Sequence, residues 1–405
     1  MWDQFTDPAE SAAVDAIYES FTEQNPNITI TREVIQTEQM RQTANTALAS
    51  GTGPDVIFYD AGAGYAGVLA EAGLIIPLED MADQYGWRER FPEQTLDATS
   101  IDGTLYGLPL QVDLIGMYYN QTLLEQEGYE IPQTVEELKT LCQEASGAGY
   151  VPMAFANNPG WQAFHQFSMM TTNMIGPEAL EALLYENQGS WDSPEITEAI
   201  GTYFVELQEA GCFSEDANAL TQDDALAMFL SGQSLMFPTG SWEIQNFTGE
   251  QVPEGTEITM MPFPEPEGGQ GSYWVSGVGS AYYISANSPN QEAAGQFLDY
   301  LFSDATAGRW VQEAQYLVPM SVDTSEMDLP PLFAHMIGQL DLAASGEIQL
   351  GYNIDVIAPP EFNETMMSGF QAVIAGDRTP EEQASLLQAA WEVWWETQEA
   401  ATPAS

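Results

Sequence analysis

Aromatic, acidic and amide side chains follow buried-looking strands at several places in this sequence. Four stretches in fixed order carry most of them: Gly53–Asp60, Asp102–Pro109, Met117–Asn120 and Met236–Trp242. A sugar offers a flat C–H face and a rim of hydroxyls, so an aromatic ring beside Asp, Asn or Gln is suited to bind it. Strand ends in α/β proteins also lie beside helix N-termini, where ligand clefts form. The stretches therefore indicate a site for a neutral, hydroxyl-rich ligand.

A glycine-rich segment, Gly62–Gly67, matches the dinucleotide-binding pattern G-x-G-x-x-G after a predicted strand. The helix predicted after it lasts only about two turns. The segment Leu74–Leu78 then leads into another helix and not into a ribose-binding strand. We interpret the glycines as a tight turn that lets Asp60 and backbone N–H groups face a ligand, and we do not expect a nucleotide there.

Residues for covalent or metal chemistry are scarce. The chain has two histidines, His165 and His335, and lacks nucleophile-elbow, zinc and EF-hand motifs. His165 is interpreted as a packed helix residue and not as a general base. Acidic pairs such as Asp223-Asp224 are interpreted as solvated turns or helix caps, with a weak calcium site as the alternative. We therefore expect no catalytic residue, no metal ligands and no cofactor.

The net charge of −54 arises from missing cations, because 61 acidic residues face only 7 Lys and Arg. Nucleic acid is excluded as a partner, since phosphate binding needs clustered basic side chains. The deficit indicates adaptation of the surface to an unusual exterior, with a basic partner as the alternative. An anionic ligand would need a basic side chain in its site, and the four stretches contain none. The basic residues are Arg32, Arg41, Arg88, Arg90, Lys139, Arg309 and Arg378.

Periodicity predicts an α/β protein of two lobes, because 405 residues exceed an ordinary single core. Apolar spacing predicts a first helix that begins after Asp7, and alternation predicts strands over 27–34, 151–155 and 234–237. Strand, helix and strand in that order predict a parallel sheet. Cys142 and Cys212 lie near the ends of two predicted helices, and a disulfide or two free thiols are both compatible with the sequence.

In order and content these segments resemble the extracellular solute-binding proteins of ABC importers, within the carbohydrate-type, maltose-binding-like group. The resemblance runs from about residue 2 to about residue 395. It implies a two-lobed periplasmic-binding-protein-like fold (type II), with a mainly parallel sheet and flanking helices in each lobe. It also implies three hinge segments, with residues 1–111 and 275–318 in the N-terminal lobe and 112–274 and 319–405 in the C-terminal lobe.

The resemblance implies that the protein captures a neutral carbohydrate, expected to be an oligosaccharide, by lobe closure and delivers it to the membrane permease subunits. It further implies a monomer located outside the cytoplasm, extracellular or periplasmic, with a lipid anchor on the precursor as one option. Members begin with an export signal and a longer first strand, so we expect that both preceded Met1.

Position by position, the resemblance nominates ligand-binding residues at strand ends and at the crossings between lobes. They are Trp2, Asp3, Gln4, Tyr59, Asp60, Asp113, Asn157, Asn158, Trp161, Trp242, Trp274, Ser276, Tyr352 and Asn353. The maltose binders continue the strand after Asp60 with charged residues, where this chain has Ala61-Gly62-Ala63, so the sugar itself is left open. The aromatic residues Trp391, Trp394 and Trp395 are expected to pack a helix.

Two other functions remain open from the sequence. Asp3, Asp60 and Asp113 near aromatic rings would also suit a cationic ligand such as a polyamine or a quaternary amine. A glycoside hydrolase needs only two carboxylates at the right separation, and with 61 acidic residues such pairs occur by chance.

Overall fold

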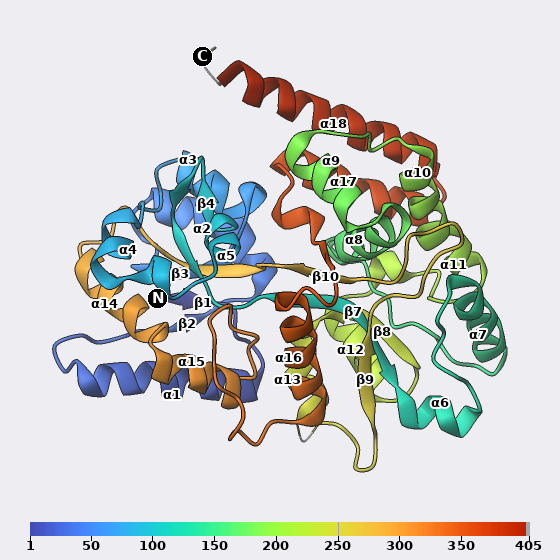
Figure 1. Cartoon of the computed structure of the whole chain (residues 1–405), viewed down its shortest axis with the longest axis horizontal. Helices are drawn as coiled ribbons and strands as arrows, with labels where there is room; N and C mark the ends of the chain where they lie inside the picture. The colour runs from blue at the N-terminus through green and yellow to red at the C-terminus, as the bar shows by residue number, and fades with distance from the viewer. Residues whose placement is uncertain (250, 402–405) are drawn as a thin grey trace. The chain divides into compact units, whose positions relative to one another are not determined.

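The computed structural model describes residues 1–249 and 251–401, with side chains to residue 397 (Figure 1). The chain divides into two compact units. Unit 1 comprises Met1–Asp113 and Gly277–Phe333, and unit 2 comprises Leu114–Ser276 and the chain from Ala334 onward. The third passage between units therefore lies at residues 333 and 334, and not near Val318 as the sequence had suggested. Among the described residues, no helix is both long and apolar enough to cross a membrane.

Unit 1 is built on a five-stranded mixed sheet in the order β2-β1-β3-β11-β6. β1 pairs in parallel with β2 and β3, and β11 is antiparallel to β3 and β6. The strands are β1 (Trp2–Asp3), β2 (Glu33–Val34), β3 (Val56–Asp60), β6 (Gly107–Pro109) and β11 (Ser280–Ile284), and β4 (Ser100–Ile101) pairs with β5 (Thr104–Leu105) in a separate hairpin.

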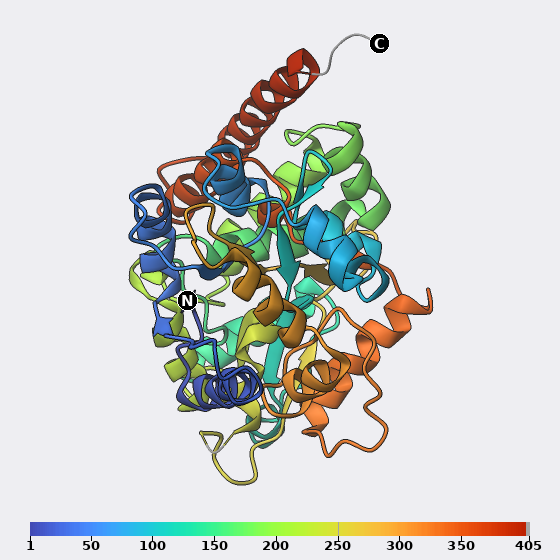
Figure 2. The ribbon, with the colours of Figure 1, turned by 90° about the vertical axis from the view of Figure 1, so that its left-hand side faces the viewer.

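Both faces of this sheet are covered, because alternate residues of β3 enter two different cores. Val56 and Phe58 belong to one core, and Ile57 and Tyr59 belong to the other. Helix α1 (Pro8–Gln24) contributes Val14, Ile17, Tyr18 and Phe21 to the first core. Figure 2 shows α1 beside α14 (Gln291–Leu301) and α15 (Asp304–Gln312), which follow β11 in sequence.

Two helices of unit 1, α1 and α15, begin at a side-chain cap, whereas α2 (Thr37–Ala49), α4 (Glu79–Tyr85) and α14 begin without one. Asp7 caps α1 by accepting hydrogen bonds from the backbone N–H groups of Ala9 and Glu10, as predicted. The helices are α1 (Pro8–Gln24), α2 (Thr37–Ala49), η1 (Ala63–Gly67), α3 (Val68–Glu71), α4 (Glu79–Tyr85), η2 (Trp87–Glu89), α5 (Glu93–Asp97), α14 (Gln291–Leu301) and α15 (Asp304–Gln312).

Unit 2 is also built on a mixed sheet, in the order β12-β10-β7-β8, with β9 paired to β7. β8 and β9 are both antiparallel to β7, whereas β10 and β12 pair with each other in parallel. The expectation of a mainly parallel sheet in each lobe is therefore corrected, because the pairings in the sheet of unit 1 also divide evenly between parallel and antiparallel. The strands are β7 (Asp113–Asn120), β8 (Met236–Gly240), β9 (Ile258–Met261), β10 (Trp274–Gly277) and β12 (Leu350–Tyr352).

The larger helices of unit 2 form one core. α8, α10, α17 and α18 contact one another (Figure 1), and Trp391 of α18 is fully buried against Trp191 and Phe362. Packing was the predicted role of Trp391. The helices are α6 (Gln121–Glu127), α7 (Val135–Gly147), α8 (Gln162–Ile175), α9 (Pro177–Glu186), α10 (Pro194–Gly201), η3 (Thr202–Glu206), α11 (Leu207–Glu209), η4 (Ala217–Ala219), α12 (Gln222–Leu230), η5 (Ser241–Glu243), α13 (Ile244–Thr248), α16 (Pro331–Ala344), η6 (Ile354–Val356), α17 (Pro360–Ile374) and α18 (Pro380–Ala401).

A disulfide joins Cys142 of α7 to Cys212, whose Cα atoms lie 4.7 Å apart. Both side chains are fully buried in the core of unit 2. The structure thus resolves the choice that the sequence had left open in favour of the bond.

Three predicted strands are corrected. Only Glu33–Val34 of the segment 27–34 forms a strand. The segment 151–155 contributes a single bridge, between Met153 and Met236. The strand predicted over 234–237 is β8, which begins at Met236 and continues to Gly240.

Candidate functional site

The carboxylate of Asp60 ends strand β3 in unit 1 and is held by an arginine. Arg41 of α2 donates from Nε to Oδ2 at 2.9 Å and from Nη2 to Oδ1 at 2.8 Å. The Asp60 side chain is 9% exposed, and that of Arg41 is 22% exposed. A forked bond of this geometry fixes both side chains and compensates their charges. The end of β3 therefore presents a neutral ion pair and not a free carboxylate.

An aromatic ring completes this arrangement. The guanidinium carbon of Arg41 lies 4.9 Å from the centre of the Tyr65 ring, within the range of a cation–π contact. Tyr65 lies shortly after β3. Between them, Gly62 has a φ of 93°, which would strain the backbone of a residue with a side chain. The predicted tight turn is therefore confined to Gly62, and the rest of the glycine segment, Ala63–Gly67, forms the helical turn η1 that leads into α3. Tyr59 is buried in the core, and this burial raises the pKa of its phenol.

The three nominated residues at the start of the chain are tied to neighbouring elements. Asp3 is fully buried and receives two bonds from Arg32, at 2.6 and 2.9 Å. Trp2 donates from Nε1 to Glu33 at 2.8 Å. Gln4 accepts a bond from Thr37, and its buried Nε2 has no hydrogen-bond partner among the described residues. These contacts connect β1 to the segment around β2 and to α2.

Asp113 is the last residue of unit 1 before the chain enters unit 2. Its carboxylate is buried and accepts bonds from Gln111 Nε2 at 3.0 and 3.2 Å. Gly279 lies against it, since a Cβ atom at that position would be 2.5 Å from Oδ2. An amide donor and a close glycine therefore position this carboxylate.

Three rings meet in unit 2, and we define Trp161, His165 and Trp242 as the ring cluster. The ring centres of His165 and Trp242 are 4.8 Å apart, those of Trp161 and His165 are 5.4 Å apart, and those of the two tryptophans are 6.4 Å apart. Both indoles are half-buried and pack on the core of unit 2. Rings fixed from behind and partly open offer apolar faces to a ligand.

Local sequence explains how the second indole reaches this place. Trp242 follows β8 in the turn Gly240-Ser241-Trp242. A Cβ atom at position 240 would come within 2.1 Å of the Trp242 ring, so only glycine leaves room for the indole. Ser241 accepts a bond from the backbone N–H of Leu114 at 3.2 Å, which anchors the turn to β7.

Polar groups lie beside the ring cluster. Nε2 of His165 is 4.0 Å from Oδ1 of Asp355, and both side chains are largely buried. Glu243 follows Trp242 and is buried, with Oε1 accepting from Gln222 at 2.9 Å and Oε2 from Asn246 at 2.8 Å. The cluster thus combines ring faces with carboxylate and amide groups in a single unit.

The nominated asparagines of the turn before α8 differ in their environment. Asn157 is fully buried, donates to Asn218 at 3.0 Å and accepts from the backbone N–H of Ala163 at 3.3 Å. These bonds fix the turn that carries Trp161. Asn158 is exposed.

The nominated residues of β10 and β12 lie next to one another. Ser276 pairs with Tyr352 in parallel register, and the Ser276 carbonyl accepts from the N–H of Asn353. Asn353 is buried, and Tyr352 contacts Tyr185 with ring centres 5.8 Å apart. Burial and the neighbouring Glu181 raise the pKa of the Tyr352 phenol. Trp274 is 3% exposed and donates from Nε1 to Gln339 at 3.0 Å.

The sequence did not indicate that Arg41 pairs with Asp60, or that Asp355 lies beside the ring cluster. Arg41 lies on the polar face of α2, and nothing local to it indicates a partner at the end of β3. His165 could have been grouped with Trp161, since residues four apart on a helix share a face. Among the described residues, no group of three or more His, Cys, Asp or Glu side chains is arranged to hold a metal ion.

Known proteins share both the sequence pattern and the fold. Residues 2–308 match the family described as bacterial extracellular solute-binding protein. A multiple sugar-binding protein of Streptococcus mutans serotype c (strain ATCC 700610 / UA159) is 25% identical over 295 residues, which are 72% of this chain and 68% of that protein. A binding protein of Brucella abortus (strain 2308) is 25% identical over 336 residues, 82% of this chain and 76% of that protein.

A solved structure of a chitin oligosaccharide binding protein shares the fold with a TM-score of 0.85 at 20% identity. The match covers 98% of this chain and 99% of that one. The two-lobed α/β architecture predicted from the sequence is thereby confirmed.

Proposed function

Because the chain belongs to the bacterial extracellular solute-binding proteins, we propose that it is the receptor of an ABC importer and captures a neutral carbohydrate without transforming it. The ring cluster of unit 2 carries this proposal. Two half-buried indoles and an imidazole, with Asp355 and the Glu243–Gln222 pair nearby, combine apolar faces with groups that bond hydroxyls. A relative named as a multiple sugar-binding protein supports the same ligand class.

The charges of unit 1 support a neutral ligand over a cationic one. Two of the three carboxylates that could have formed a cation cage are already bonded to arginines, Asp3 to Arg32 and Asp60 to Arg41. A cation would have to compete with a forked ion pair at each of them. Asp113 receives an amide donor. We propose Asp60, Asp113, Trp161 and Trp242 as the main ligand contacts, with the other nominated residues in supporting roles.

The proposal also includes a location outside the cytoplasm, delivery to a membrane permease and the absence of catalysis. Closure of the two units on the ligand is part of it, since three chain passages join them. A fall in the radius of gyration on adding ligand, measured by X-ray scattering, would support closure, and an unchanged value at saturation would contradict it.

Calorimetry with neutral oligosaccharides, polyamines and betaines tests the ligand class. We expect a dissociation constant of about 1 μM for at least one neutral oligosaccharide, which corresponds to a binding free energy of roughly 8 kcal/mol. Trp242→Ala should weaken it by about tenfold or more, because an aromatic face contributes about 1 kcal/mol beyond its buried area. Trp394→Ala is the matched control, because Trp394 is also a half-buried indole on the core of unit 2.

Three results would contradict the proposal. They are binding of polyamines or betaines alone, equal loss of affinity in both tryptophan variants, and release of reducing sugar during prolonged incubation. The last of these would indicate a glycoside hydrolase.

A further inference from the structure

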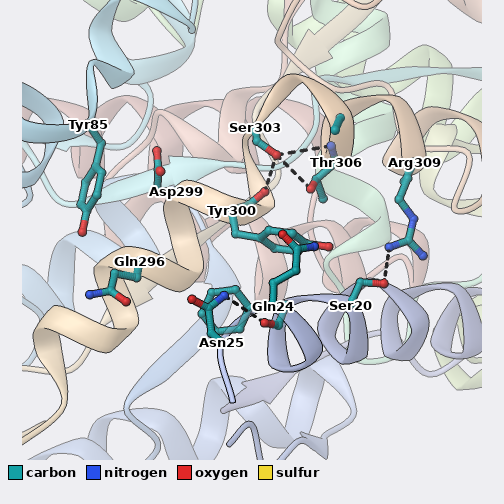
Figure 3. Close-up of a pocket in the computed structure, with 12 residues that line it drawn as sticks. Ser20, Gln24, Asn25, Tyr85, Gln296, Asp299, Tyr300, Ser303, Thr306 and Arg309 are labelled. Carbon is teal, nitrogen blue, oxygen red and sulfur yellow. Dashed lines mark hydrogen bonds between the residues drawn. The ribbon is translucent and has the colours of Figure 1, made fainter. Parts of the chain in front are cut away.

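Unit 1 contains a hollow of about 580 Å³. Residues of its helices line this hollow (Figure 3). We define it by the helix ends that enclose it: the last turns of α1 and α14, the first turns of α15, and Tyr85 at the end of α4. Its volume falls within the range of pockets that hold small ligands, roughly 300–1,000 Å³. None of its lining residues belongs to the proposed carbohydrate contacts.

Two phenol rings in the hollow are held from behind by other aromatic residues. Tyr300 packs against Phe21 with ring centres 5.4 Å apart, and Tyr85 stacks on Trp87 at 5.3 Å. Both tyrosines are half-buried, so part of each ring faces the hollow. Supported rings bind a ligand at a low cost in conformational entropy.

The charges in the hollow are compensated within unit 1. Asp299 is bonded to Arg90 at 2.8 Å. Arg309 makes two bonds to Glu313, at 2.7 and 2.8 Å, and a third to the hydroxyl of Ser20 at 2.9 Å. A charged ligand would have to displace one of these partners, whereas a neutral ligand would not.

Two amides remain available for hydrogen bonds. Gln24 of α1 and Gln296 of α14 both line the hollow, and both side chains are exposed and without a hydrogen-bond partner among the described residues. Each amide supplies two donors and an acceptor group. Rings, hydroxyls and free amides together match the flat face and hydroxyl rim of a sugar.

From this arrangement we propose that the hollow is a second, accessory site for a neutral carbohydrate, separate from the site of the ring cluster. It would bind weakly, because the two amides that line the hollow are exposed to water. An accessory site of this kind would hold a glycan on unit 1 independently of capture at the ring cluster.

Hydrogen–deuterium exchange of the full chain tests the proposal, with maltotriose, xylotriose and chitotriose as probes at roughly millimolar concentration. We expect at least one probe to slow exchange in residues 20–25 and 299–309, in the natural protein and equally in Trp242→Ala. Tyr300→Ala and the double variant Gln24→Ala/Gln296→Ala should each raise the probe concentration needed to slow exchange by about tenfold. The double variant changes only exposed side chains, so it preserves folding.

The outcomes separate the two sites. Slower exchange in 20–25 and 299–309 that survives Trp242→Ala and is lost in the double variant supports the accessory site. Unchanged exchange there with all three probes overturns it, whether or not unit 2 responds. Loss of the effect in Trp242→Ala also overturns it, because the hollow would then depend on the ring cluster.

Discussion

The guanidinium of Arg41 makes a forked pair of hydrogen bonds to the carboxylate of Asp60, and its central carbon lies over the ring of Tyr65. The pair presents a compensated charge at the end of β3. In the proposed site, a compensated carboxylate would favour a neutral ligand over a cationic one, although the chain has only 7 basic residues and 61 acidic ones.

Substitution of Arg41 should change both stability and ligand preference. Arg41→Gln leaves the largely buried carboxylate of Asp60 without its cation, which should lower the free energy of unfolding by about 2 kcal/mol. Affinity for neutral oligosaccharides should fall, and weak binding of polyamines should appear. Urea unfolding and calorimetry measure both effects.

The control is Arg88→Gln, which breaks an exposed pair with Glu79 and should cost less than about 1 kcal/mol without changing ligand preference. If both variants behave alike, the pair of Arg41 and Asp60 has no particular role in the site.

The sequence located one half of this pair and not the other. Asp60 was found because it ends a buried strand, and strand ends are readable from short apolar runs. Arg41 was missed because its role depends on how α2 packs beside β3, which the spacing of residues within α2 does not encode. Trp242 was nominated as a ligand contact through its Gly-Ser-Trp turn, and the structure adds that Gly240 makes room for the indole.

The strands that were predicted wrongly fail for a similar reason. Ile28 and Ile30 alternate as a strand would, and they pack partly against the first core of unit 1. Only Glu33 and Val34 reach β1 to form ladder bonds. Alternation reports burial of one face, whereas a strand also needs a neighbour within hydrogen-bonding distance.

Acidification should remove the contribution of the Glu79 carboxylate to the stability of the folded protein. Its carboxylate accepts bonds from the Leu105 N–H at 2.8 Å and from Arg88 at 2.5 Å, and these bonds hold its pKa below the ordinary value of 4.5. Because the folded pKa is the lower one, the contribution to stability is complete above about pH 4.5 and is lost as the pH falls through the folded value.

Glu79→Gln should therefore be less stable than the natural protein at neutral pH, and the difference should shrink as the pH falls, as measured by urea unfolding at several pH values. A difference between the two proteins that grows on acidification would contradict the assignment. The effect is expected to be small, because both side chains of the pair are exposed.

Salt should stabilise the folded protein. The net charge is −54, so the acidic side chains repel one another in the compact state. All seven basic side chains are already bonded within the protein. The Debye length falls from about 10 Å at 0.1 M to about 3 Å at 1 M, so added salt screens the repulsion. We expect the Tm to rise steadily with sodium chloride, measured by calorimetry.

Guanidinium chloride and urea provide a check on this interpretation, because only the first adds ions. At low denaturant concentrations guanidinium chloride should raise the Tm and urea should lower it. A Tm that does not depend on sodium chloride would show that the surface charges are balanced by other means.

Reduction of the disulfide should destabilise unit 2 more than unit 1. Cys142 and Cys212 are 70 positions apart in the sequence, and closing a loop of that size contributes about 4 kcal/mol by restricting the unfolded chain. Cys142→Ser/Cys212→Ser should therefore unfold at lower urea, and exchange should accelerate first in α7 and in the segments packed around it. Unit 1 contains neither cysteine, so its exchange rates serve as the internal reference. Equal acceleration in both units would mean that the bond stabilises the whole chain as one cooperative body.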